Sequence, residues 1–266
     1  MTVKTKWLAI GLIGCAAAVA GAVYIVRDLD VLIGSIVPGA SISRTTSMTL
    51  VSISLRDSRR NGELRLRMPA AYLLRASDRR GGSVETFMAE TRLPTLGPLP
   101  AFPTARGRPG TPEYEIAMAD FNNGISFRMT NSYLDEKGYG ARLRENLLAR
   151  FSVGRDSGKT TAYELVDEDY FGLWRYDQLS CPTATGCRKD DEHYLSKPAA
   201  TPTVHILCSA QLLSTHDERV ACDANTVYRG FQLFYSIPRS QLSRWGEFDS
   251  GVRRLLDRFA QDAAQR

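Results

Sequence analysis

One run in the sequence has the residue types of a phosphate-binding loop. Gly154-Arg155-Asp156-Ser157-Gly158-Lys159-Thr160 places a lysine and a threonine after two glycines. A nucleotide-binding loop needs four residues between its glycines so that its backbone amides surround the phosphates, and this run has three. The run also follows a predicted helix instead of a strand. We therefore predict no nucleotide site and no cofactor.

A second candidate is a metal site drawn from His205, Cys208, His216 and Cys222. The spacings H-x2-C and H-x5-C match no familiar zinc pattern. Disulfide formation in an oxidising compartment would also compete for both thiols. We therefore expect no metal ligands here.

Two acidic runs form a third candidate, Asp167-Glu168-Asp169 and Asp190-Asp191-Glu192. Paired carboxylates can act as general acid and base, but neither run has a fixed spacing or a partner. No Gly-x-Ser-x-Gly nucleophile elbow is present either. We therefore predict that the chain is not an enzyme and has no catalytic residue. Both runs are interpreted as solvated loops that, together with Trp174 and other aromatics nearby, are candidate contacts to a protein partner.

Four cysteines, Cys181, Cys187, Cys208 and Cys222, lie within forty-two residues. In an oxidising compartment an even number of this kind is expected to pair. Four cysteines allow three connectivities. We favour the pairing that is local in sequence, Cys181–Cys187 and Cys208–Cys222.

The compartment follows from residues 7–26, which contain no charge over twenty residues. As a helix this run spans ~30 Å, the thickness of a bilayer's hydrocarbon core. Lys4 and Lys6 precede it, which favours a cytoplasmic N-terminus and an exported body. We expect an uncleaved single-pass anchor over 1–26 in a bacterial-type inner membrane, with the bulk of the chain in the periplasm.

Two other interpretations of the anchor remain open. A cleaved signal peptide would end at Ala18-Val19-Ala20. A lipoprotein would be acylated on Cys15, although eleven apolar residues follow that cysteine. All three interpretations place the body outside the cytoplasm, where nucleic acid is an unlikely partner.

The rest of the chain divides into a tether over 27–46 and an α+β domain over 47–266, with two possible subdomains at 47–155 and 156–266. Alternating hydrophobicity and turn signals predict mainly antiparallel sheets. The predicted strands are a hairpin over 48–68, a strand over 83–92, a hairpin of 114–118 with 125–129, and further strands over 161–166, 170–176, 203–208 and 226–237, the last interrupted at Arg229-Gly230.

Helical spacing is found at two places. Arg142 to Phe151 carries an apolar face, and an amphipathic C-terminal helix, capped by Ser240, runs to Phe259. Residues 93–112 contain six prolines and read as a long surface loop, which is a further candidate contact.

Several short motifs follow one another along the chain. They are Met68-Pro69-Ala70-Ala71-Tyr72-Leu73 with Gly81-Gly82, Phe171-Gly172-Leu173-Trp174-Arg175-Tyr176, the four cysteines expected to pair, Tyr228 to Ile237, and the helix from Leu242-x-x-Trp245 to Phe259. The order of these motifs resembles the periplasmic immunity proteins encoded beside lipase effectors of the bacterial type VI secretion system. The resemblance covers most of residues 48–260.

The resemblance implies a protein that binds and neutralises a lipase-type toxin in the periplasm. It carries no catalytic residues to transfer. Two other classes remain open: an envelope assembly protein that binds a stable partner, and an envelope-polymer hydrolase. The first would show a large apolar patch, and the second a concave pocket of acidic residues with shifted pKa values.

Overall fold

The computed structural model describes residues 44–57, 62–99, 110–133, 138–140, 159–182, 187–197, 202–209 and 220–264. They belong to a compact unit that spans Ile42–Arg266. The predicted anchor over 1–26, most of the tether and the predicted helix over 142–151 lie outside the described residues. Within the described part of the chain, no helix combines the length and the apolar character that a membrane crossing requires.

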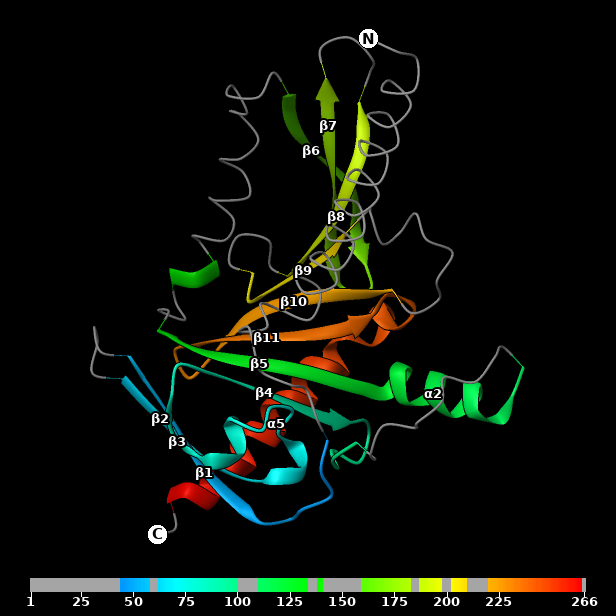
Figure 1. Cartoon of the computed structure of the whole chain (residues 1–266). Helices are drawn as coiled ribbons and strands as arrows, with labels where there is room; N and C mark the ends of the chain where they lie inside the picture. The colour runs from blue at the N-terminus through cyan, green and yellow to red at the C-terminus, as the bar shows by residue number, and fades with distance from the viewer. Residues whose placement is uncertain are drawn as a thin grey trace, which may run out of the picture. The chain divides into compact units, whose positions relative to one another are not determined.

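Eight of the described strands form one antiparallel sheet in the order β4-β5-β11-β10-β9-β8-β7-β6 (Figure 1). This sheet joins strands from both sides of residue 155, the boundary predicted between two subdomains. β6 ends the order, so its outer edge pairs with no other described strand. The strands are β4 (Thr86–Arg92), β5 (Gly124–Tyr133), β6 (Lys159–Tyr170), β7 (Leu173–Pro182), β8 (Arg188–Ser196), β9 (Val204–Ser209), β10 (Ala221–Tyr228) and β11 (Phe231–Pro238).

A smaller sheet has the order β2-β1-β3. β1 (Leu50–Asp57) and β2 (Gly62–Pro69) form the antiparallel hairpin predicted over 48–68, and β3 (Gly82–Val84) pairs with β1 in parallel. Every second residue of the hairpin is buried, as alternating hydrophobicity predicts. Two short 3₁₀ helices, η1 (Ala70–Tyr72) and η2 (Asp78–Arg80), connect the hairpin to β3.

The C-terminal helix supplies the centre of the core. After Pro238 the chain forms the 3₁₀ helix η4 (Arg239–Arg244) and then α5 (Trp245–Ala264), which packs against β2 (Figure 1). The predicted apolar stripe is confirmed, because Phe248, Val252, Leu255, Leu256 and Phe259 are buried. The predicted cap was wrong: Ser240 lies inside η4, and α5 begins at Trp245.

The predicted strand over 114–118 was also wrong, since these residues lie in helix α2 (Pro112–Asn123). The signals for a helix start are all present. The Thr111 side chain accepts a hydrogen bond from the backbone N–H of Tyr114 at 3.3 Å, and Pro112 occupies the first turn. Glu113 and Glu115 then place negative charge at the positive end of the helix. These end signals outweigh the apparent alternation.

The proline-rich stretch 93–112 is only partly the surface loop that we predicted. Leu93, Leu96 and Leu99 are buried, and the Tyr72 hydroxyl donates to the Leu96 carbonyl at 2.9 Å. A Cβ built on Gly251 of α5 would lie 3.0 Å from Leu93 Cδ2. The first part of the stretch is therefore packed against the C-terminal helix.

Candidate functional site

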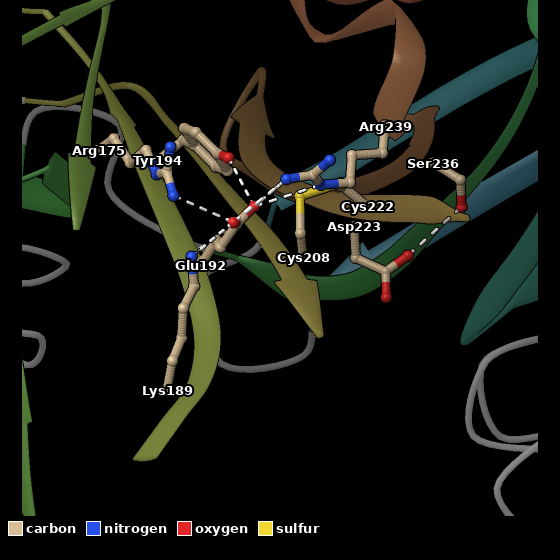
Figure 2. The surroundings of a disulfide bond; sticks show 9 residues. All are labelled: Arg175, Lys189, Glu192, Tyr194, Cys208, Cys222, Asp223, Ser236 and Arg239. Carbon is tan, nitrogen blue, oxygen red and sulfur yellow. Dashed lines mark hydrogen bonds and ion pairs between the residues drawn. A yellow bond between two sulfur atoms is a disulfide. The ribbon is translucent and has the colours of Figure 1, made fainter. Parts of the chain in front are cut away.

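A buried carboxylate links three distant parts of the chain. Glu192 of β8 is 2% exposed, and its oxygens accept hydrogen bonds from Arg175 of β7 at 3.1 Å and from Lys189 at 2.7 Å. The Tyr194 hydroxyl donates at 2.8 Å. Arg239, at the entry to η4, approaches the carboxylate at 3.1 Å (Figure 2).

These donors fix the charge state of Glu192. Burial alone would raise the pKa of its carboxyl group, but the hydrogen bonds from Lys189 and Tyr194 and the charge of Arg239 lower the pKa below its usual value. Asp177 adds a second carboxylate that pairs with Lys189 at 2.8 Å. Because Glu192 is buried and its donors come from the same chain, the arrangement is a structural clamp and offers no free group for catalysis.

The disulfide beside this clamp agrees with part of the predicted pairing. Cys208 of β9 and Cys222 of β10 form a disulfide, and both are fully buried (Figure 2). The hypothetical metal site is therefore excluded at these two thiols. Cys187 is also disulfide-bonded. The side chain of Cys181 lies outside the described residues, so the Cys181–Cys187 pair stays a prediction.

Two histidines meet on the other face of the sheet. His193 Nδ1 lies 3.0 Å from His205 Nε2, and the rings stack with an interplanar angle of 8°. Gln178 Oε1 lies 3.0 Å from His193 Nε2, and the Tyr163 ring packs edge-on against His193. Within the described ranges, no group of three or more His, Cys, Asp or Glu side chains is placed to hold a metal ion.

The most accessible candidate site lies along β6. We define the β6 edge surface as the exposed residues of this strand and of the turn that follows it: Glu164, Leu165, Val166, Asp167, Glu168, Asp169 and Phe171. Val166 is 48% exposed and Phe171 is 52% exposed. Lys197 pairs with Asp169 at 2.6 Å, and this bond lowers the pKa of Asp169. Four carboxylates against one ammonium group leave the surface acidic.

The turn that ends this surface has an unusual backbone. Phe171 and Gly172 both have positive φ, 55° and 80°, and connect β6 to β7 across the pair Tyr170–Leu173. A two-residue hairpin turn of this kind favours Asn, Asp or Gly at its first position, and other residues cost ~1 kcal/mol there. The Phe171 ring packs against Tyr170 at 4.6 Å between ring centroids, and its carbonyl accepts from Trp245 Nε1 at 2.9 Å.

The structure separates the residues that we predicted as partner contacts. Asp167, Glu168 and Asp169 are exposed and lie together on the β6 edge surface. Trp174 is half-buried and packs with Tyr163 and Leu195.

The second acidic run does not form a loop. It lies in β8, where Asp190 pairs with Arg188 and Asp191 is half-buried. Glu192 is not accessible to a protein partner, because its side chain is buried and hydrogen-bonded within the chain.

In the sequence, Trp174 is singled out, and Phe171 is predicted only as one of the aromatics near the acidic run. The signal that could have identified it is the dipeptide Phe171-Gly172 between two strand-like segments, because an aromatic residue before the glycine of a tight hairpin is unfavourable. A parallel signal, Arg229-Gly230, was noticed only as an interruption. It forms the turn between β10 and β11, with φ values of 49° and 84°.

No family model matches the chain, and no curated protein matches it. Two solved structures resemble it. One is Smlt3025, an immunity protein of the Stenotrophomonas maltophilia type IV secretion system, with 15% identity over 83% of this chain and 94% of that chain and a TM-score of 0.48. The other is FrpD, an iron-regulated outer membrane lipoprotein of Neisseria meningitidis, with 8% identity over 83% of this chain and 96% of that chain and a TM-score of 0.36. At this level of similarity, no function is transferred from either protein.

Proposed function

We propose that this chain is an immunity protein that binds a lipase-type effector of a type VI secretion system in the periplasm and neutralises it. The observation that carries the proposal is the β6 edge surface, where exposed Leu165 and Val166, and Phe171 in the turn, lie on either side of the carboxylates of residues 167–169 at the end of a sheet. Exposed apolar side chains framed by charge are typical of a surface that a protein partner covers.

The sequence motifs support the same function. The motifs that resemble the immunity family include Phe171-Gly172-Leu173-Trp174-Arg175-Tyr176, and this run forms the turn and the start of β7 beside the β6 edge surface. The clamp around Glu192 lies directly behind it, since Tyr194 packs against Tyr170 at 5.3 Å. The residues of this motif therefore connect the exposed strand and turn to the buried part of the sheet.

The proposal includes the location of the protein. Residues 7–26 would hold it in the inner membrane by a single pass, with the domain in the periplasm. An inhibitor held at the membrane surface would meet a phospholipase where that enzyme meets its substrate. A periplasm-active reporter fused after Arg266 should be active, and the mature protein should retain residues 1–26.

A toxicity assay tests the function. The candidate lipase-type effector should kill cells when it is exported to the periplasm, and the full chain should protect them. A version without residues 1–26, which stays in the cytoplasm, should fail to protect. A periplasmic toxin that cleaves peptidoglycan is the control, and it should kill with or without this chain. If the full chain gives no protection and the purified proteins do not bind, the proposed function is wrong.

A further inference from the structure

The β6–β7 turn and the β10–β11 turn each begin with a non-glycine residue of positive φ, Phe171 and Arg229. The side chains of these two residues make different contacts. Arg229 has φ 49°, yet its side chain is committed to its own chain, since it pairs with Asp257 at 2.9 Å and lies over the Tyr228 ring at 5.4 Å. Phe171 has φ 55°, and half of its side chain faces solvent. The Arg229 side chain is about as exposed, but its charged group is ion-paired, whereas Phe171 leaves half of an apolar side chain in solvent at a position where phenylalanine is disfavoured.

The turn is also held in place. The Trp245 indole at the start of α5 donates to the Phe171 carbonyl at 2.9 Å, and the Phe171 ring packs against Tyr170. The Tyr170 ring in turn packs against the Tyr194 ring at a tilt of 36°, and the Tyr194 hydroxyl donates to the buried Glu192. The exposed ring therefore stands on a fixed backbone, and fixing it before binding reduces the entropy that binding would cost.

The charges around the ring define its partner. Asp167, Glu168 and Asp169 precede it on β6. Lys197 pairs with Asp169, and Arg175, opposite Asp167 on β7, is ion-paired with Asp177 and Glu192. A carboxylate-rich rim attracts Lys and Arg and raises the association rate at low salt. An aromatic ring surrounded by such a rim is typical of an interface anchor that fills a pocket on the partner.

We infer that Phe171 is the anchor of the toxin interface and inserts into an apolar pocket rimmed by lysine and arginine on the effector. This inference rests on the proposed function and names the part of the β6 edge surface that carries the affinity. The acidic residues increase the rate at which the effector associates, and the Phe171 ring contributes most of the affinity.

The test uses the full chain in detergent and the purified lipase-type effector of the proposed function. Phe171→Asn relieves the strained turn, so the variant should melt at the same temperature as the wild type or higher. It should nevertheless bind the effector at least 30-fold more weakly, which corresponds to ~2 kcal/mol. Arg229→Asn is the matched control, because it relieves the same strain in the other turn and should leave the dissociation constant unchanged.

The steering component has its own test. Asp167→Asn with Glu168→Gln should slow association several-fold at low salt and flatten the dependence of that rate on salt. Glu113→Gln with Glu115→Gln removes two exposed carboxylates from α2 and should not change the association rate. If both double variants changed the association rate equally, the inferred rim of lysine and arginine on the effector would be wrong.

The outcomes separate the two proposals. If the wild type binds the effector and Phe171→Asn weakens binding by less than tenfold, the anchor is wrong and the immunity function stands. If the wild type does not bind the effector at all, both are overturned. A loss of binding that is equal in Phe171→Asn and Arg229→Asn would also overturn the anchor, because it would report a general effect of the turns.

Discussion

The indole Nε1–H of Trp245 donates a hydrogen bond of 2.9 Å to the carbonyl oxygen of Phe171, across 74 positions of the sequence. It joins the first residue of the C-terminal helix to the turn between β6 and β7. The core helix and an exposed aromatic residue at the end of the sheet are therefore connected directly.

Trp245→Phe should loosen this turn without unfolding the protein. The variant keeps an aromatic ring but loses the N–H donor, so we expect a loss of ~0.5–1 kcal/mol in the free energy of unfolding. Amide hydrogen exchange at Gly172 and Leu173 should become faster, while exchange in the β10–β11 turn should not change. Unchanged exchange at Gly172 would show that the hydrogen bond does not hold the turn.

Glu192→Gln should be strongly destabilising. It leaves Arg175, Lys189 and Arg239 beside a neutral group. Breaking a fully buried ion pair from one side costs ~3–5 kcal/mol, and this is an upper limit here because Lys189 and Arg239 are partly exposed to solvent. Glu63→Gln is the matched control, because Glu63 also bonds two arginines, Arg56 and Arg65, on an exposed strand. Urea unfolding should show a large loss for the first variant and little change for the second. Similar losses would contradict the clamp.

Stability should fall in acid mainly through Glu192, because solvent screens the exposed Glu63 and makes its contribution small. Both have lower pKa values in the folded state than in the unfolded state, and the pKa of Glu63 is lowered to about 2, first by its hydrogen bond from Arg65. A group of this kind stabilises the fold above its unfolded pKa of 4.5, and the contribution is lost as pH falls through the folded pKa. The urea concentration at the midpoint of unfolding should therefore decrease as the pH is lowered below 4.5. This decrease should be smaller in Glu192→Gln than in the wild type. An equal drop in that variant would assign the effect to other groups.

Removing the Cys208–Cys222 disulfide should destabilise the oxidised protein. The bond closes a loop with a sequence separation of 14, for which the chain-entropy model gives ~3 kcal/mol. Cys208→Ala with Cys222→Ala avoids a buried polar group and should show this loss in urea unfolding. Reductant should affect the wild type more than this double variant. Equal stability of the two oxidised proteins would contradict the prediction.

Two glycines of α5 should respond in opposite directions to alanine. At Gly251 a Cβ would lie 3.0 Å from Leu93 Cδ2 and 3.4 Å from Leu96 Cδ2, so overpacking should exceed the gain in helix propensity. We expect Gly251→Ala to lose ~1 kcal/mol. Gly246→Ala meets no heavy atom within 4 Å and should gain up to ~1 kcal/mol. Thermal melting of both variants measures the difference. A melting temperature of Gly251→Ala above that of the wild type would show that residues 93–96 move to accommodate the added methyl group.

The parts of the fold that sequence predicted are those where one local pattern dominates. The hairpin over 48–68 and the stripe from Leu242 to Phe259 each follow a single period, and both are confirmed. Tyr114 to Met118 alternates like a strand, yet Thr111 and Pro112 start a helix there. In such a short segment the end signals and the period conflict, and the period alone was misleading.

The candidate site was predictable only in part. The acidic run 167–169 is exposed, as its composition suggests, whereas Glu192 has the same chemistry and is buried. The difference arises because Arg175 and Arg239 come from other elements and converge on Glu192 in the folded chain. Partners that are distant in sequence are invisible to local patterns.

The position of β11 has a consequence for how the chain is made. β11 lies between β5 and β10, and the paired residues Phe127 and Tyr235 are separated by about a hundred residues of chain. A ribosome adds ~5–20 residues per second, so β11 is synthesised ~5–20 seconds after β5. During that time one edge of β5 is open to other chains. A chaperone that covers β4 and β5 until synthesis ends would therefore raise the yield of folded protein.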